Sequence, residues 1–560
     1  MRSNVFKIFA IIVLVEIVLL IYSSIFPEIN ISIFNKNFKF KFLSIDDILN
    51  FEKKKENKVA DKIVSTYLQT DTSKNEKDII NLISKLPLDS LKIEKIAQEI
   101  TSKHLTKDSI ENTKIIKDII NNYLTNDFSK PQKILKRLLL AYLGVNFKND
   151  FLINPEVFKT RPLDAFFSAL ANNKDTAIIR IAHYGDSQLE GDRISCYLRK
   201  RFQQKFGGSG IGFVPFVDIA KNVSLTRYNS ENWTRYTVFH HRFYNSFYGL
   251  SGTVFKFRKY VLNNDSIIAN IADSIGLKNY KIFPNAVIDL NLEGYVNYQN
   301  ISLMYGHSLE DCIVNVYNNS TREKIYTDTL KTSESINIQK LKLPLYLQNF
   351  RLEFICDNSP DFYGLLIDSK NGVQVDNYAI RGHSGDGLLL INSDYLSRQI
   401  EMLNTKLIIF QFGANVVPYI YSDKQCDWLE TVYYNLFMKF RNAAKDASIL
   451  VIGAGDMATT INGEDMSYPY LPKIRDAQKN AAIKAGCAFL DLFKIMGGSN
   501  SILTWVSKRL ASKDGHFSSK GQEIIGNELF NALMLEYDLY KLNPSVNGKS
   551  ISSIKKLRDK

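Results

Sequence analysis

The chain has 560 residues, of which 45% are hydrophobic and 23% are charged, and its formal net charge is +13. This composition excludes a largely disordered chain, a collagen-like repeat and a protein with many membrane spans. The five cysteines include no Cys-x-x-Cys pair, so we expect neither a disulfide framework nor a zinc site. Residues 541–560 carry five lysines and one arginine against one aspartate. We interpret them as a basic disordered tail, with attraction to anionic glycan or lipid headgroups as the alternative.

The N-terminus has the pattern of a membrane anchor. Arg2 and Lys7 precede Ile8–Phe26, a stretch of 19 residues whose only charge is Glu16. Such a stretch is long enough to cross a hydrocarbon core of ~30 Å as a helix. The basic residues favour a cytoplasmic N-terminus, which puts the rest of the chain in the periplasm or otherwise outside the cytoplasm. No small-residue cleavage site follows, so we expect an uncleaved anchor over residues 1–29. Because the rest of the chain is expected outside the cytoplasm, we expect no nucleic-acid partner.

The rest of the chain changes pattern three times. Residues 30–150 repeat apolar positions at helical spacing, which predicts a helical membrane-proximal region. Residues 215–372 alternate β-branched and aromatic residues with polar ones between Asn, Asp and Ser turns, which predicts an all-β, jelly-roll-like domain. Residues 151–214 and 373–540 alternate buried strands with helices, which is typical of a covered parallel sheet. We therefore expect one α/β domain that is split by an inserted β domain.

The predicted elements of the α/β domain are short apolar strands and amphipathic helices. The strands are expected at Thr176–Ala182, Leu407–Phe412, Ser448–Ile452 and Ala488–Asp491, and the helices at Tyr433–Ala444, Lys473–Ala485 and Gly521–Tyr537.

Three segments put polar residues at the ends of elements. Gly185-Asp186-Ser187 lies between a strand and a helix, where the helix N-terminus stabilises developing negative charge. Asn415 follows the strand that ends at Phe412, and its amide is a candidate donor to an oxyanion. His516 lies in a loop beside a carboxylate, the arrangement that a serine nucleophile requires of its general base. Taken singly, each segment is more simply an ordinary turn or helix cap.

Taken together and in this order, the segments resemble the blocks of the SGNH/GDSL superfamily of serine esterases and acyltransferases. Block I is Gly185-Asp186-Ser187, block II contains Gly382, block III is Gly413-Ala414-Asn415 and block V is Asp514-Gly515-His516. The resemblance covers about 200 residues, roughly 176–214 and 373–538. It implies a flavodoxin-like, three-layer α/β domain.

The resemblance also implies roles for individual residues. Ser187 is the expected nucleophile and His516 the general base, with Asp514 orienting the imidazole. The oxyanion hole is expected to consist of the Ser187 and Gly382 main-chain N–H groups and the Asn415 amide. Gly185 and Asp186 shape the block I turn.

One feature departs from the family pattern. The superfamily usually has Asp-x-x-His, whereas here one residue separates Asp514 from His516 and the position three before the histidine is Lys513. Either the loop rearranges so that Asp514 reaches the ring, or a main-chain carbonyl or another carboxylate orients it. Asp456 and Asp491, which follow strands, are the alternative carboxylates.

Within the superfamily, the chain looks most like a membrane-anchored or secreted branch from bacteria of the Bacteroidetes type. That branch has a β insert between blocks I and II and a Met-Gly-Gly and Trp stretch, seen here as Met496–Gly498 and Trp505. Its members are associated with O-acetyl groups on cell-wall or surface glycans.

Three functions follow from this resemblance. The first is an esterase acting on an acetylated polysaccharide or peptidoglycan, and the second is an O-acetyltransferase supplied by a membrane acyltransferase partner. The third, a non-catalytic glycan-binding or scaffold protein, is suggested by the unusual Asp-His spacing. Neither enzyme reaction needs a metal or another cofactor.

Other residues near the blocks are weaker candidates. His183, Gln188, His383 and Gly413 are possible pocket residues, although packing or capping is the simpler interpretation of the two histidines. Candidates for sugar contacts are Arg193, Arg381, Trp233, Tyr236, His240 and His241, with salt bridges or core packing as the alternative.

Overall fold

The computed structural model describes residues 28–33, 36–41, 151–155, 161–173, 177–262, 280–294, 296–344 and 347–542 of the chain. The chain forms two units, Met1–Phe147 and Lys148–Lys560. In the first unit, β1 (Glu28–Ile33) and β2 (Lys36–Lys41) form an antiparallel pair, so the helical prediction for the region from residue 30 onward is wrong at residues 30–33 and 36–41. The predicted anchor Ile8–Phe26, the predicted helical segments beyond β2 and the tail after Leu542 lie outside the described residues. None of the described helices is both long enough and apolar enough to span a bilayer.

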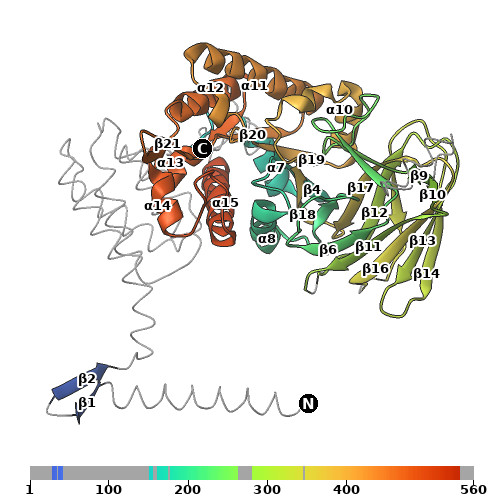
Figure 1. Cartoon of the computed structure of the whole chain (residues 1–560), viewed down its shortest axis with the longest axis horizontal. Coiled ribbons are helices and arrows are strands. Elements are labelled where there is room, and N and C mark those ends of the chain that lie inside the picture. The colour runs from blue at the N-terminus through green and yellow to red at the C-terminus, as the bar shows by residue number, and fades with distance from the viewer. Residues whose placement is uncertain are drawn as a thin grey trace, which may run out of the picture. The chain divides into compact units, whose positions relative to one another are not determined.

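The second unit is built on a six-stranded sheet in the order β18-β4-β19-β20-β23-β3 (Figure 1). The first five strands are parallel, and only β3 at the edge runs antiparallel to its neighbour. In chain order the parallel strands are arranged 2-1-3-4-5, which is the flavodoxin-like order. The prediction of a parallel α/β sheet is therefore confirmed. The strands are β3 (Leu152–Ile153), β4 (Ile178–Gly185), β18 (Gly372–Ala379), β19 (Thr405–Gln411), β20 (Ser448–Ile452) and β23 (Ala488–Leu490).

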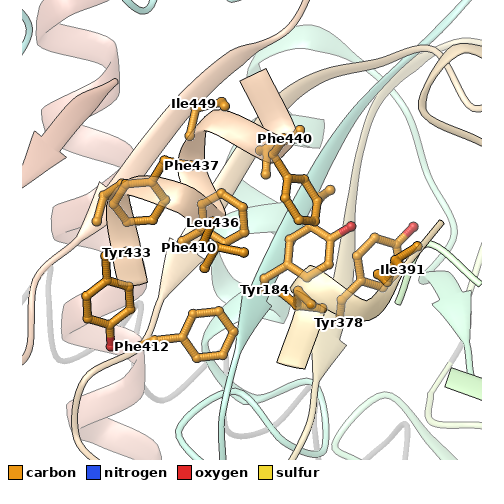
Figure 2. Close-up of a cluster of buried hydrophobic side chains, with 14 of the residues drawn as sticks. Tyr184, Tyr378, Ile391, Phe410, Phe412, Tyr433, Leu436, Phe437, Phe440 and Ile449 are labelled. Atoms are coloured by element: carbon orange, nitrogen blue, oxygen red, sulfur yellow. The ribbon is translucent and has the colours of Figure 1, made fainter. Parts of the chain in front are cut away.

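Helices cover both faces of this sheet because the strands are apolar on both sides. In β19, Leu407 and Ile409 join the core beneath α7, α8 and α15, whereas Ile408 and Phe410 join the core beneath α10, α11 and α12. Figure 2 shows the core beneath α10, α11 and α12, in which Phe410 packs against Phe437 and Phe440 of α11. The helices are α7 (Asp164–Asn172), α8 (Arg193–Phe206), α10 (Ser393–Met402), α11 (Asp423–Ala443), α12 (Leu471–Lys484), α13 (Leu492–Met496), α14 (Ser501–Ser507) and α15 (Ser519–Leu542).

The sequence pattern underestimates the length of α11. The helix begins ten residues before the predicted start at Tyr433, because Ser422 caps it by accepting a hydrogen bond from the Gln425 N–H. Most residues of its first turns are exposed, and only Cys426 and Leu429 there continue the buried stripe of the rest of the helix.

The predicted all-β insert has two large antiparallel sheets that enclose their own apolar core, and a small antiparallel pair of β9 (Tyr260–Leu262) and β10 (Tyr280–Ile282). One sheet has the order β14-β13-β16-β11-β6, and the other has the order β15-β12-β17-β8-β7, with β5 paired to β17. Strands alternate inward and outward residues, as facing sheets require. The strands are β5 (Gly212–Val214), β6 (Leu225–Asn229), β7 (Trp233–Thr237), β8 (Thr253–Phe257), β11 (Ala286–Leu292), β12 (Asn300–Gly306), β13 (Cys312–Asn318), β14 (Lys324–Leu330), β15 (Asn337–Leu341), β16 (Asn349–Ile355) and β17 (Asp361–Asp368).

A buried ion network joins the insert to the α/β sheet. Arg180 of β4 donates to both carboxylate oxygens of Asp376 on β18, at 3.0 and 3.1 Å, and also to Asp368 at the end of β17. Asp376 in turn accepts from the main-chain N–H of Phe213 in β5. Since all three charged side chains are buried, this network fixes the insert beside the first two strands of the sheet.

Candidate active site

The predicted site residues meet at the carboxyl ends of two adjacent strands. Ser187 follows β4, the first parallel strand, and Asn415 follows β19, which pairs with it. The chain continues from β4 to β18 on one side and only then to β19 on the other, so the strand order reverses at this point. Ligands of open α/β sheets bind in the crevice at such a reversal.

Ser187, His516 and Asp514 form a continuous hydrogen-bonded chain. The Ser187 Oγ lies 2.8 Å from Nε2 of His516, and Nδ1 of the same ring lies 2.9 Å from the Asp514 Oδ2. An imidazole placed between a hydroxyl and a carboxylate is able to remove the hydroxyl proton while the carboxylate stabilises the resulting positive charge.

A tight turn explains how Asp514 contacts the ring across one intervening residue. Gly515 adopts φ 84°, and the main-chain N–H of Ser512 donates to the His516 carbonyl at 2.9 Å. The turn folds the Asp514 side chain back onto its own loop, where it also accepts from the Ser512 hydroxyl. Lys513 instead extends away to pair with Asp465 at 2.5 Å.

Hydrogen bonds keep the Asp514 carboxylate ionised. Partial burial raises its pKa, but the bonds from the Ser512 hydroxyl, the His516 main-chain N–H and the His516 ring outweigh burial and lower the pKa below its usual value. The carboxylate is therefore available as a hydrogen-bond acceptor at neutral pH.

Gln188 ties the serine segment to the histidine loop. Its side chain donates to the Gly515 carbonyl at 2.8 Å and accepts from the Phe517 N–H at 3.5 Å. Gln188 is buried and lines a pocket that also includes Asp186, Gly455 and Gly515. These contacts give Gln188 a positioning role.

Two of the expected oxyanion donors are main-chain N–H groups. In the part of the chain that the structure describes, the main-chain N–H groups of Ser187 and Gly382 have no hydrogen-bond partner. Gly382 adopts φ 72°, and a Cβ built on it would lie 3.4 Å from the Phe239 ring and 3.9 Å from the His240 imidazole. Both residues belong to the loop between β7 and β8, so the inserted domain borders the site.

Thr237 holds this loop in place. Its hydroxyl accepts from the N–H groups of Phe239 and His240 and donates to the His240 carbonyl at 2.7 Å. Sequence reasoning missed Phe239, because only the packing of the insert against block II brings its ring to Gly382.

Asn415 is anchored by two acceptors in this structure. Its amide donates to the Asp186 Oδ2 at 2.9 Å and to the His383 carbonyl at 3.2 Å. Asp186 also accepts from the Gln188 N–H. Burial raises the pKa of Asp186 to about 6, although these hydrogen bonds and the nearby His516 act in the opposite direction. The block I aspartate thus connects Ser187 to block III.

Three of the possible pocket residues are packing residues instead. His183 is fully buried between Gln411 and Ser195, at 3.1 Å from each, and burial lowers its pKa to about 4. His383 is also buried, accepts from the Gly387 N–H, and has a pKa lowered to about 4 by burial. Gly413 lies against the Gln478 amide, where a Cβ would come within 2.8 Å. None of the three lines the pocket beside Gln188.

The two arginines have protein partners. Arg381 pairs with the buried carboxylate of Glu190, at 2.5 and 2.7 Å, and Arg193 donates to the Ser187 carbonyl at 3.2 Å. The salt-bridge interpretation of Arg381 therefore agrees with the structure.

The candidate sugar-binding residues of the insert do not form one surface. Trp233 is buried among Phe216, Phe257 and Phe354 in the core of the insert, so it is not available to a sugar. Tyr236 packs on the exposed His241, whereas the exposed His240 faces Gly382.

The alternative carboxylates lie in other networks. Asp456 is fully buried and accepts from Ser467, Ser501 and the Ile502 N–H. Asp491 caps α13 by accepting from the Lys494 N–H. Neither replaces Asp514 beside His516.

Comparison with known proteins identifies the fold. No family model and no curated protein matches the sequence. The structure of a peptidoglycan O-acetylesterase matches 69% of this chain and 99% of its own chain, with 19% identity and a TM-score of 0.52. An acetyl xylan esterase matches 29% of this chain and 81% of its own, with 14% identity and a TM-score of 0.23. A family two carbohydrate esterase from Clostridium thermocellum matches 46% and 94%, with 10% identity and a TM-score of 0.21.

The last two structures resemble the chain too weakly to inform its fold. The peptidoglycan O-acetylesterase is matched over nearly its whole length. The matched share of this chain, 69%, is larger than its α/β domain alone, so the match extends into the insert. This chain therefore shares the fold of that esterase, in agreement with the fold that its resemblance to the SGNH/GDSL superfamily implies.

Proposed function

We propose that this protein is a serine esterase that removes O-acetyl groups from a cell-wall or surface glycan through an acyl-serine intermediate. The observation that carries this proposal is the hydrogen-bonded chain of Ser187, His516 and Asp514 at the strand-order reversal of the parallel sheet. The peptidoglycan O-acetylesterase that shares the fold supports the choice of an acetyl ester on a glycan.

The first half-reaction transfers the acetyl group to the protein. His516 takes the proton of the Ser187 hydroxyl as the Oγ attacks the acetyl carbonyl, and Asp514 stabilises the imidazolium that forms. The oxyanion accepts from the main-chain N–H groups of Ser187 and Gly382. As the tetrahedral adduct collapses, His516 gives the proton to the departing sugar oxygen, which leaves acetyl-Ser187 and a free sugar hydroxyl.

The second half-reaction uses water. His516 removes a proton from water as it attacks the acyl-serine carbonyl, and returns that proton to Oγ when acetate leaves. Asn415 supplies a third donor to both oxyanions. Its amide turns so that the longer of its two hydrogen bonds, to the His383 carbonyl, is exchanged for one to the oxyanion, while the bond to Asp186 is kept. Such a donor contributes about 10²–10³ to the rate.

The expected location fits this substrate. We propose that Ile8–Phe26 anchors the chain with its catalytic part outside the cytoplasmic membrane, where cell-wall and surface glycans occur. Fractionation of cells that make the full chain, with protease added to spheroplasts, tests this location.

Acetate release tests the reaction. The full chain in detergent is incubated with O-acetylated peptidoglycan and with acetylated xylan, with free acceptor sugars present. We expect free acetate, and the Ser187→Ala variant should lower its rate at least about 10⁴-fold. The matched control is Ser507→Ala, which changes an exposed serine of α14. Serine-independent release, or no release from either glycan, contradicts the proposal, and acetylated acceptor sugar without free acetate reassigns the protein as a transferase.

A further inference from the structure

Three large aromatic side chains are exposed just beyond block III. Tyr419 is 71% exposed, Tyr421 is 73% exposed and Trp428 is 60% exposed. Between the two tyrosines, Ile420 is buried in the core, as is Val417 before them, so the segment is fixed while its tyrosine rings face solvent. Rings exposed to this extent on a fixed segment are typical of an interaction surface. We call these three residues the aromatic rim.

Gln425 holds the aromatic rim together. Its side chain accepts from the Tyr421 N–H at 2.9 Å and donates to the Tyr419 carbonyl at 3.0 Å. Trp428 lies three residues after Gln425 on the same side of α11, and side chains on a helix lean toward its N-terminus. Trp428 thus lies within one helical turn of the residue that holds the two tyrosines. The main chain is therefore fixed at both tyrosines, and Trp428 is carried by a helix, so little main-chain freedom is lost when a ligand binds these residues.

The aromatic rim is close to the candidate active site along the chain. The short helix η2 (Val417–Tyr419) begins two residues after Asn415. Tyr419 is four residues and Tyr421 six residues from Asn415, so their Cα atoms lie at most about 14 and 22 Å from that of Asn415. A ligand of several sugar units with an acetyl group at Ser187 is long enough to reach these rings.

The chemistry of the aromatic rim suits a carbohydrate. Flat ring faces pack against the C–H groups of a pyranose, while the tyrosine hydroxyls and the indole N–H bond its hydroxyls. The neighbouring charges sum to zero: Asp423 pairs with Lys473 at 2.5 Å, and Lys424 and Asp427 are opposite in sign. A lipid surface is instead bound by apolar side chains, aromatic ones included, beside an excess of basic ones, and these four charges contain no such excess.

We propose that the aromatic rim is a subsite that binds pyranose units of the glycan next to the acetylated sugar, and so makes the protein prefer polymeric over small acetyl esters. This inference rests on the proposed function for its substrate. It assigns recognition of the polymer to the α/β domain, on the segment that follows Asn415.

A comparison of two substrates tests the subsite. The kcat/KM of the full chain is measured on O-acetylated peptidoglycan and on 4-nitrophenyl acetate, for the natural protein and for the triple variant Tyr419→Ala, Tyr421→Ala, Trp428→Ala. The kcat/KM for peptidoglycan, divided by that for 4-nitrophenyl acetate, should fall at least about tenfold in the variant, because the KM for the glycan rises. The matched control is Tyr228→Ala, which removes an equally exposed aromatic ring from β6. An unchanged ratio overturns the subsite.

A binding experiment separates this inference from the proposed function. Proteins with Ser187→Ala, with and without the triple substitution, are sedimented with insoluble O-acetylated peptidoglycan. We expect the triple substitution to weaken binding about tenfold, while circular dichroism and the thermal midpoint stay unchanged because all three rings are exposed. Equal binding by both proteins overturns the subsite, whether or not the natural protein releases acetate. Absence of acetate release together with rim-dependent binding contradicts only the proposed reaction.

Discussion

Asp514 contacts the His516 ring across a single intervening residue, with its Oδ2 2.9 Å from Nδ1. The positive φ of Gly515 makes this possible, because it closes a turn that neither an extended loop nor a helix provides. The residue three positions before the histidine, Lys513, is occupied elsewhere by its ion pair with Asp465. The shorter spacing therefore preserves the contact that the usual Asp-x-x-His pattern supplies.

Asp514→Asn should lower kcat by about 10²-fold while KM changes little. The loss of a triad carboxylate costs about 10⁴-fold in a buried setting, but the Asp514 side chain is 64% exposed and water compensates in part. Lys513→Ala serves as the control, because Lys513 contacts no residue of the triad. A similar loss of kcat in both variants, measured by acetate release, is incompatible with the assigned contact.

The stability of the protein should depend on pH through Asp186. Burial raises the pKa of this carboxyl from 3.8 to about 6 in the folded protein, so the folded state binds the proton more tightly than the unfolded state. This contribution to stability is present in full below the unfolded value and is lost as pH rises through about 4 to 6. The shift corresponds to about 3 kcal/mol.

Denaturant unfolding at pH 4, 5, 6 and 7, for the natural protein and Asp186→Asn, isolates this contribution. The free energy of unfolding of the natural protein relative to the variant should decrease across the window from about pH 4 to about 6 and then level off. A difference that is constant over the whole range contradicts the assignment of the titration to Asp186.

Much of the fold was accessible from sequence because its signals are local. The strand Ser448–Ile452 has the predicted bounds, since its five residues are all buried and flanked by polar turns. The order of Ser187, Asn415 and His516 along the chain was sufficient to expect them at one edge of a parallel sheet. Their hydrogen bonds follow from that placement.

The sequence signals failed where tertiary packing decides. His183 and His383 lie beside blocks I and II, yet each is directed into the core by the strand or turn that carries it. Phe239 borders Gly382 from about 140 residues earlier in the chain, a contact that no local pattern encodes. The prediction omits the first turns of α11 because only Cys426 and Leu429 among residues 423–432 are buried, so the apolar repeat is weak there.

Replacing Arg180 should destabilise the protein strongly. Arg180→Met leaves the buried carboxylates of Asp368 and Asp376 without their cation, and breaking such a buried pair costs about 3–5 kcal/mol. Arg351→Met is the matched control, because it removes an ion pair with Asp289 that is partly exposed and worth about 0–1 kcal/mol. Denaturant midpoints of the two variants give the comparison, and equal shifts argue against a stabilising role for the buried network.

Phe239→Ala should change the preference for the acyl group. The edge of the Phe239 ring lies 3.4 Å from the position of a Cβ on Gly382, whose N–H is an expected oxyanion donor, so the ring limits the space beside the acyl carbonyl. Removing the ring makes room for a longer chain, and burying each added methylene contributes about 0.8 kcal/mol. We therefore expect the kcat/KM for 4-nitrophenyl butyrate relative to the acetate to rise by about tenfold.

Tyr244→Ala provides the control for this change. Tyr244 belongs to the same loop between β7 and β8 but is 81% exposed, and it is not among the atoms nearest to Gly382. The butyrate-to-acetate ratio of this variant should match that of the natural protein. A loop that merely loosens affects the two esters alike. If Phe239→Ala lowers activity on both esters in equal proportion, the ring therefore stabilises the loop and does not limit the size of the acyl group. A rise in the ratio for Phe239→Ala alone assigns part of the acyl selectivity to the inserted domain.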